Sequence, residues 1–250
     1  MRTPWRATTL LSNLRSDQIN LSDETKQQYE PIFWHSVCTE YDSRNFYAHL
    51  KSSNLKPTSE FETFLSHWLK DETNHTEGFV ILYGLIYQQS ETDIYARLKA
   101  RPVDFSPLEQ FFSDEFKLCL LLAYDEIVTT WVYHRSIPFY EHLGPRELKT
   151  WILKLKSDEA LHFNNLLKIL KARHFHRFGE AESILEQILH LDQTLTQYGS
   201  TFVLDHQCDD FSLTQSELVS LGSGIILKKL HSFKPTQTPT QTPTQKGETQ

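Results

Sequence analysis

The chain has 250 residues and a mass of 29.3 kDa, enough for one large domain or two small ones. No apolar run approaches the about 18 residues of a membrane-spanning helix, and a net charge of −7 excludes a general nucleic-acid binder. Only eight glycines are present, without a Gly-x-Gly-x-x-Gly or Walker-type loop, which argues against a nucleotide-binding fold. Three cysteines without a Cys-x-x-Cys pair indicate free thiols in a reducing compartment.

The two ends of the chain differ in composition from its middle. Residues 1–16 contain three arginines and no acidic residue, which is typical of a short basic arm or of the remnant of an organelle transit peptide. Residues 235–250 repeat Pro, Thr and Gln without any apolar side chain, so we expect a disordered tail. The sequence therefore predicts an N-terminal arm over residues 1–30 and a cytoplasmic protein, or one of an organelle stroma if the arm is a transit remnant.

The first two long helices are predicted from aromatic and apolar spacing. Residues 31–52 are rich in aromatic side chains at spacings of three and four. Ser59 and Glu62 form a capping box, which opens a second helix over roughly residues 59–90 with one apolar face.

Two further long helices follow. Residues 106–109 read Ser-Pro-Leu-Glu, a helix start signal. The third helix that it opens, over roughly residues 107–141, contains the most apolar stretch of the chain, Leu118 to Val132. Gly144-Pro145 separates it from a fourth helix over roughly residues 145–177.

The remaining segments predict smaller helical additions. A fifth helix runs from Gly179 to Gly199, residues 200–211 form a loop, and residues 212–231 form a last amphipathic helix. Strand signals are weak. Long helices with short connections predict an all-α protein. It would consist of an antiparallel four-helix bundle over residues 31–178 with additional helices over residues 179–234 packing on it.

Two helical segments carry the same pattern of ionisable residues. Residues 71–75 read Asp-Glu-Thr-Asn-His, and residues 158–162 read Asp-Glu-Ala-Leu-His. Glu and His three positions apart lie on one helical face, so each pair can bind the same metal ion. One Glu-x-x-His is expected about once by chance in this composition, but two with a preceding Asp are not. The alternative is a pair of ordinary surface ion pairs.

Two such motifs need one further Glu from each of two more helices to complete the ligand set of a di-iron carboxylate bundle. The third helix offers Glu126, with Asp125 as its neighbour, and the first offers Glu40, with Asp42 and Glu30 as alternatives. Without a metal, Glu126 would be a hydrogen-bonded buried acid and Glu40 a solvated side chain. Carboxylates with some imidazole suit iron or manganese, so we expect two iron ions or an iron–manganese pair.

The motifs resemble those of the soluble acyl-carrier-protein desaturases of the ferritin-like superfamily over about residues 32–170. The second helix of that family reads Trp-x-x-x-Glu-x-x-His, matched here by Trp68, Glu72 and His75. Its fourth helix reads Asp-Glu-x-x-His, matched by residues 158–162. The resemblance implies a ferritin-like four-helix bundle with Glu159 and His162 among the metal ligands.

The same resemblance selects the two remaining ligands. The ligand of the family's first helix follows a Thr and has a Tyr downstream, which points to Glu40 with Tyr47. The ligand of its third helix is followed three residues later by a Thr near the O₂ site, which matches Glu126 and Thr129. The resemblance thus implies a catalytic role for the Thr129 hydroxyl, whereas the alternative is a hydrogen bond back to its own helix. The chain is shorter than the plant enzymes and shows no match after about residue 180.

Metal-bound histidines usually donate their other ring N–H to a carboxylate. Asp71 and Asp158 are the candidates, each reaching across the bundle to the His of the opposite motif. The resemblance implies that Trp68 extends this network toward the surface as a path for electrons; the alternative is core packing.

Two features bear on substrate and partners. The run Leu118–Val132 and the segment Phe79–Tyr87 flank the predicted metals, either as walls of a channel for a fatty chain or as filled core. Basic residues crowd the end of the fourth helix, where they could bind an acidic carrier protein or an acidic ferredoxin, or compensate the helix dipole. They are Lys168, Lys171, Arg173 and Arg177.

The ligand pattern and the resemblance together predict an O₂-dependent di-iron oxidase acting on a fatty acyl chain, most closely a desaturase. Its expected partners are O₂, a fatty acyl substrate on an acyl carrier protein, a ferredoxin-type electron donor and a second copy in a homodimer, without nucleic acid. The alternatives are another di-iron oxygenase, which would hydroxylate, N-oxygenate or cleave fatty acids or aldehydes, and a non-enzymatic ferritin-like iron-binding protein.

Overall fold

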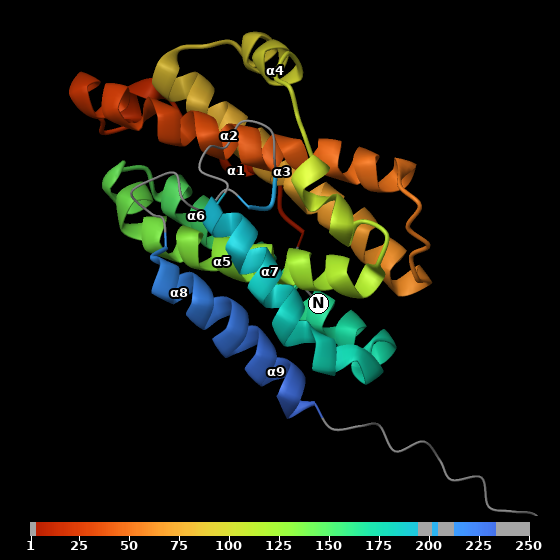
Figure 1. Ribbon diagram of the computed structural model, residues 1–250. Helices are drawn as coiled ribbons and strands as arrows, with labels where there is room; N and C mark the ends of the chain where they lie inside the picture. The colour runs from red at the N-terminus through yellow and green to blue at the C-terminus, as the bar shows by residue number, and fades with distance from the viewer. Residues whose placement is uncertain (1–3, 195–201, 205–212, 234–250) are drawn as a thin grey trace, which may run out of the picture.

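The structure, a computed structural model, describes residues 4–194, 202–204 and 213–233. Within these residues every regular element is helical, which confirms the all-α prediction. Four long helices form two antiparallel pairs (Figure 1), α2 (Asp23–Ser52) with α3 (Ser59–Tyr87) and α5 (Glu115–His142) with α6 (Arg146–Arg173). The pairs face one another, with α3 in contact with α6.

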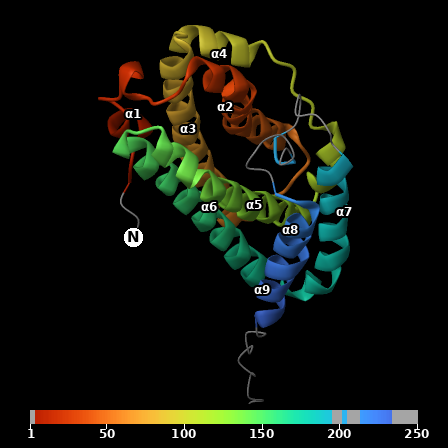
Figure 2. The same cartoon turned by 90° about the vertical axis from the view of Figure 1, so that its left-hand side faces the viewer.

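Shorter elements cover the outside of the two pairs (Figure 2). The N-terminal α1 (Ala7–Leu10) packs on α3 and α6, α4 (Glu91–Lys99) on α3, and α7 (Ala181–Thr194) on α5. The C-terminal rod consists of α8 (Gln215–Val219), a π-helical turn (Ser220–Ile226) and α9 (Leu227–Ser232). It lies against α5, α6 and α7. Short 3₁₀ helices span Ser16–Gln18, Ser106–Phe111 and Phe175–Glu180.

The first long helix begins earlier than predicted. Ser22 caps α2, because its side chain accepts a hydrogen bond from the backbone of Thr25, and two acids in the first turn favour this start. Pro31 therefore lies inside α2 rather than at its beginning. Part of the predicted N-terminal arm is thus the first two turns of a bundle helix.

Two other helix starts differ from the prediction. Thr58, not Ser59, caps α3 by accepting a hydrogen bond from the backbone of Phe61. The Ser-Pro-Leu-Glu signal opens the 3₁₀ helix Ser106–Phe111, and Asp114 caps α5. Short polar side chains next to one another compete for the same capping position, so sequence alone places the start only to within a few residues.

The short helix α4 was not predicted. Gln88 ends α3 in the left-handed conformation, and Ser90 then caps α4 through the backbone of Asp93. Its residues Ile94 and Leu98, one turn apart, are buried. The predicted tail over residues 235–250 lies outside the described residues, as does nearly all of the predicted loop over residues 200–211.

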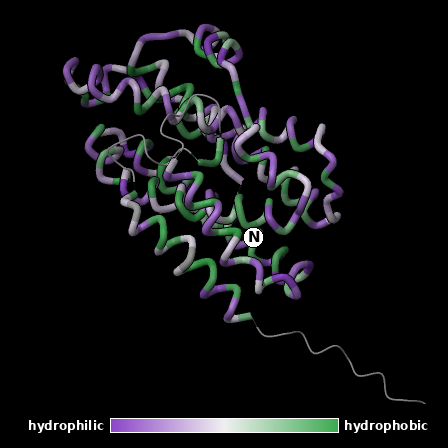
Figure 3. The backbone as a smooth tube through the Cα atoms, in the orientation of Figure 1, coloured by the Kyte–Doolittle hydropathy of each residue, from purple (hydrophilic) through white to green (hydrophobic). Residues whose placement is uncertain are grey.

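The core consists of two hydrophobic halves with a polar layer between them. One half contains Phe61–Trp68 of α3, Phe116–Val128 of α5 and Phe163–Leu170 of α6. The other contains Phe79–Ile86 of α3 and Leu148–Leu155 of α6. Residues 71–75 and 158–162 lie between the halves on their helices. Hydrophobic and hydrophilic stretches alternate along the tube in Figure 3, as expected for helices that bury one face. Among the described residues, no helix is long and apolar enough to span a membrane.

Candidate metal centre

Six buried ionisable side chains meet in the polar layer. They divide into two overlapping groups, and in each group one potential ligand atom per residue lies within 4.8 Å of the others. The first group is Glu40, Glu72, His75 and Glu159, and the second is Glu72, Glu126, Glu159 and His162. The structure thus brings together the six residues predicted as ligands, from all four long helices, with exposed fractions of 0% to 4%.

Glu72 and Glu159 belong to both groups and turn one oxygen toward each histidine. Glu159 places Oε1 3.2 Å from Nδ1 of His75 and Oε2 3.2 Å from Nδ1 of His162. Glu72 places Oε2 3.7 Å from Nδ1 of His75 and Oε1 3.4 Å from Nδ1 of His162. Two carboxylates arranged in this way can bridge two ions.

Glu40 and Glu126 each complete one group. Glu40 Oε2 lies 3.4 Å from Nδ1 of His75, and Glu126 Oε2 lies 3.1 Å from Nδ1 of His162. Each half of the centre therefore contains one histidine, one carboxylate of its own and the two shared carboxylates.

The donor atoms fit divalent cations. An octahedral ion with bonds of roughly 2.1 Å holds neighbouring ligand atoms about 3 Å apart, close to the separations found here. Four atoms pointing into the centre have no hydrogen-bond partner among the described residues: Glu40 Oε2, Glu72 Oε1, His75 Nδ1 and Glu159 Oε1. Buried polar atoms without a hydrogen-bond partner lower the stability of the fold, and a pair of bound cations would provide a partner for all four.

Two aspartates orient the histidines from outside the centre. Nε2 of His75 lies 3.3 Å from Oδ2 of Asp158, and Nε2 of His162 lies 3.2 Å from Oδ2 of Asp71. Each contact joins the two motif-bearing helices, α3 and α6. With Nε2 held in this way, each imidazole presents Nδ1 to the centre.

The N-terminal segment closes the centre on the α3–α6 side. Trp5 donates an indole hydrogen bond of 2.9 Å to Asp158 Oδ2, and its ring stacks on His75 at 6.2 Å. The backbone N–H of Ala7 donates a hydrogen bond of 2.7 Å to Asn74. Trp5 therefore continues the Asp158–His75 contact toward the surface.

Neutral donors hold the two unshared glutamates. Trp68 is buried and donates its indole N–H to Glu126 Oε1 at 2.7 Å. Tyr133 is buried beside Glu40 and donates its phenolic O–H to Glu40 Oε1. Trp68 thus contacts a candidate ligand on α5, because its indole points into the bundle rather than toward the surface. A role in electron transfer stays a prediction.

Charge crowding shifts the pKa values inside the centre. Burial and the charge of Glu159 hold the pKa of Glu72 well above its usual range, and burial does the same for Glu126. Burial alone would lower the pKa of both histidines, but adjacent carboxylates, led by Glu159 at His75 and Glu126 at His162, raise it well above normal. Burial would raise the pKa of Glu159, yet both histidines outweigh it and lower that pKa. Protons and imidazolium charge therefore balance the carboxylates where metal ions would do so.

The alternative acids on α2 face other partners. Glu30 accepts a hydrogen bond from Tyr83. Asp42 accepts a hydrogen bond of 2.7 Å from Arg101 Nη2 and another from Asn45. Both residues lie outside the two groups, which leaves Glu40 as the contribution of α2.

The predicted catalytic Thr129 is partly exposed, whereas its neighbour Thr130 is buried. The Thr130 hydroxyl donates to the Glu126 carbonyl at 2.7 Å, a bond back to its own helix. A catalytic role for Thr129 stays a prediction.

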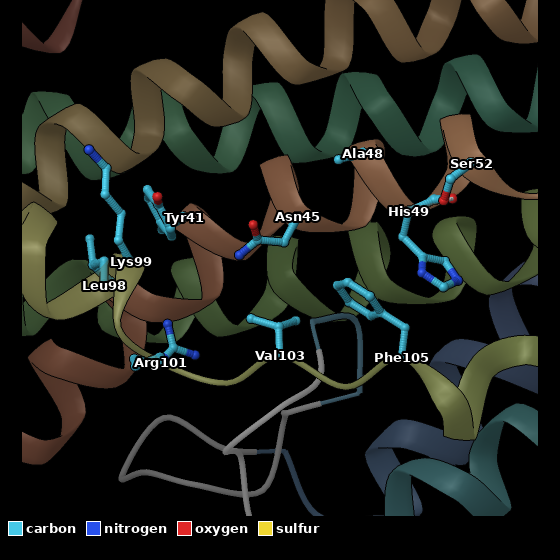
Figure 4. Close-up of a pocket in the computed structure, with 10 residues that line it drawn as sticks. All are labelled: Tyr41, Asn45, Ala48, His49, Ser52, Leu98, Lys99, Arg101, Val103 and Phe105. Atoms are coloured by element: carbon cyan, nitrogen blue, oxygen red, sulfur yellow. Dashed lines mark hydrogen bonds between the residues drawn. The ribbon is translucent and has the colours of Figure 1, made fainter.

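The predicted channel walls are largely filled core. All residues from Leu118 to Val128 are buried, and apart from Asp125 and Glu126 they belong to one hydrophobic cluster. A pocket of about 560 Å³ lies elsewhere (Figure 4), between α2 and the segment from Leu98 to Phe105. The residues of α2 that line this pocket, beginning with Tyr41 and Asn45, lie on a different face of the helix from Glu40.

The basic end of α6 is partly neutralised within the chain. Arg173 pairs with Glu60, and Arg177 pairs with Asp114 at 2.8 Å and with Glu180 at 2.7 Å. Docking of an acidic partner there stays a prediction.

Sequence reasoning missed Tyr133 and Trp5. Tyr133 lies seven residues after Glu126, two helical turns along the same face, so its position at the centre could have been found. Trp5 gave no such signal, because its contact with Asp158 spans 153 positions. No family model, no curated protein and no solved structure matches this chain.

Proposed function

We propose that the protein is a di-iron, O₂-dependent oxidase built on a ferritin-like four-helix bundle. The observation that carries this proposal is the pair of overlapping groups that share Glu72 and Glu159. Four buried carboxylates face only two imidazoles, and burying charge that is not fully paired is costly, so bound cations would stabilise the cluster. Oxygen donors with some imidazole suit iron or manganese.

A reduced iron pair, when bound, supplies the electrons and the redox chemistry needed to attack an unactivated C–H bond with O₂. The residues of the chain provide ligation and positioning. Asp71 and Asp158 fix the histidine orientation, Trp68 and Tyr133 hold the unshared carboxylates, and the surrounding hydrophobic halves exclude water.

The substrate in this proposal is a fatty acyl chain, carried by an acyl carrier protein and oxidised in a desaturase-like reaction. The support is the resemblance of the Trp-x-x-x-Glu-x-x-His and Asp-Glu-x-x-His segments. Electrons would come from a ferredoxin-type donor, and the active form would be a homodimer.

Metal content tests the centre directly. The protein would be loaded anaerobically with ferrous iron, desalted and assayed for bound metal per chain. We expect two ions per chain in the unmodified protein and loss of one or both in Glu159→Gln, because Glu159 faces both histidines. Glu115→Gln is the matched control, since Glu115 is also buried but lies at the end of the bundle, bound to Thr58 and His174.

A protein that binds no iron, or a Glu159→Gln variant that keeps both ions, would contradict the proposal. O₂ consumption then separates the two classes of function. Uptake that depends on an added acyl substrate indicates an oxidase, whereas two bound ions without substrate-dependent uptake indicate a non-enzymatic iron-binding protein. Gel filtration distinguishes a homodimer from the cage that iron storage requires.

A further inference from the structure

A small cavity lies between α2 and α5 beside the candidate metal centre. It has a volume of about 20 Å³, which is room for a molecule of one or two heavy atoms. Its lining comes from the first half of α2 and the last half of α5. The lining residues are Tyr29, Ile32, Phe33, Ser36, Val132, Tyr133, Ser136, Phe139 and Tyr140.

The exposed wall of the cavity is mainly apolar. The hydroxyl of Ser36 donates to the carbonyl of Ile32 at 3.1 Å, and that of Ser136 donates to the carbonyl of Tyr133 at 3.0 Å. The Tyr133 hydroxyl is engaged with Glu40. These three hydroxyls therefore donate within the protein and not into the cavity, whereas a buried water needs two to four polar partners. The chemistry of the lining therefore favours a small apolar molecule.

One side chain separates this cavity from the centre. Tyr133 forms part of the cavity wall, and its hydroxyl contacts a carboxylate oxygen of Glu40. Ser36 lies one turn before Glu40 on α2, so the cavity and the candidate ligand occupy neighbouring levels of the same helix. A molecule leaving the cavity toward the bundle interior meets the centre after passing one phenol ring.

Two other sides of the centre are covered. Trp5 and α1 lie over the α3–α6 side, and the buried run from Leu118 to Val128 of α5 belongs to the hydrophobic half next to the centre. On the α2–α5 side the cavity is partly open, and aromatic rings form much of its wall. The ring of Phe139 stacks on Tyr29 at 4.8 Å and meets Phe33 at 5.9 Å. Ring rotation can widen such an opening without moving a helix.

We propose that this cavity is a binding site for molecular oxygen, which reaches the metal centre along the α2–α5 interface past Tyr133. The inference rests on the proposed function, because O₂ has a use there only if the centre binds a redox-active metal. It assigns the site to a diatomic apolar gas, a ligand that matches the volume, the mainly apolar wall and the position of the cavity.

Xenon is a suitable probe, because it binds small apolar cavities and is visible in diffraction. Crystals of the iron-loaded protein would be pressurised with xenon, and we expect a xenon atom between α2 and α5 beside Tyr133 and Ser136. Ser136→Leu fills the cavity and should abolish this peak, whereas Ser136→Ala is the matched control and should keep it. Ser36→Leu fills it from the opposite helix and replaces Ser136→Leu if that variant does not fold.

A second readout connects the cavity to the chemistry. In the ferrous protein, Ser136→Leu should slow the reaction with O₂ severalfold at unchanged iron content, and Ser136→Ala should not. Absence of xenon, an ordered water in the cavity, or unchanged O₂ kinetics in both filled variants would overturn the inference while leaving the di-iron proposal intact. A protein that binds xenon but no metal would overturn both.

Discussion

Trp5 and Asp158 are joined by a 2.9 Å hydrogen bond between residues 153 positions apart in the chain. The bond ties the N-terminal segment to the carboxylate that holds His75. Lys154 lies over the same indole ring at 5.7 Å. The first residues of the described chain are therefore part of the surroundings of the candidate centre.

Trp5→Phe should weaken metal binding on the His75 side of the centre. An aromatic ring would remain at position 5, but the hydrogen bond to Asp158 would be lost. Loss of a hydrogen-bonding partner around a metal-bound histidine typically lowers metal affinity by about 10–100-fold. Stability should fall by about 1 kcal/mol. Ferrous or cobalt titration and thermal unfolding measure the two effects. Trp131→Phe, at an indole that is 41% exposed on α5, should change neither, and equal effects of both substitutions would count against this role of Trp5.

Tyr133→Phe and Trp68→Phe should act on opposite halves of the centre. Tyr133 donates a hydrogen bond to Glu40, and Trp68 donates one to Glu126. Each substitution should therefore lower the affinity for one ion by about tenfold or more and leave the affinity for the other unchanged. Titration with cobalt, followed by its visible absorption, resolves the two binding steps. Each variant serves as the control for the other, and a uniform loss at both steps would show that the donors act on the fold alone.

Removal of metal should reverse the pH dependence of stability. In the metal-free protein the pKa values of Glu72, Glu126 and both histidines are raised. Groups with a raised folded pKa contribute stability that is present below their unfolded pKa and is lost as the pH rises through the folded value. The metal-free protein should therefore melt at lower temperature in mildly alkaline than in mildly acidic solution.

Metal binding must displace those protons, so affinity should increase with pH and binding should release protons into a weakly buffered solution. The metal-loaded protein should consequently gain stability over the same range in which the metal-free protein loses it. Melting curves of both forms at several pH values, together with proton release on titration, test this. Parallel curves for the two forms would contradict it.

Gly78→Ala should destabilise the protein. A Cβ at Gly78 would overlap the indole of Trp151, which is fully buried on the facing helix α6. Overpacking of this kind costs about 1–3 kcal/mol. A Cβ at Gly179 would meet no other part of the described chain within 4 Å, so Gly179→Ala should be neutral or stabilise by up to about 1 kcal/mol. Urea unfolding compares the two, and equal stability of both variants would rule out the close contact as the reason for glycine at position 78.

Helix spacing made the inner residues of the centre predictable. Glu72 and His75 are three positions apart, as are Glu159 and His162, and local periodicity is enough to place each pair on one face. Glu126 stood out because it is an acid within an apolar run. Glu40 was harder, since its helix also offers Glu30 and Asp42, and the packing against Arg101 and Tyr83 that sets those two aside is tertiary.

The parts that could not be predicted depend on contacts between distant segments. The aromatic spacing placed the first helix at residues 31–52, whereas α2 begins at Asp23 and continues through Pro31, which removes one hydrogen bond inside the helix. The helix α4 has only nine residues, too few for a clear apolar periodicity, and its cap Ser90 was not predicted as a helix start. Closure of the centre by Trp5 follows from the path of the chain and has no local signature.

The two halves of the centre differ chemically, because Glu40 and Glu126 accept hydrogen bonds from different kinds of donor. A phenol oxygen can accept as well as donate a hydrogen bond, whereas an indole N–H only donates. The Tyr133 hydroxyl can therefore hand a proton onward, whereas the Trp68 indole cannot, and the Glu40 half also borders the cavity lined by Tyr133. Two ions held by the same kinds of ligand would consequently differ in affinity and reactivity. The two positions would fill one after the other, and two different metals could each occupy a preferred position.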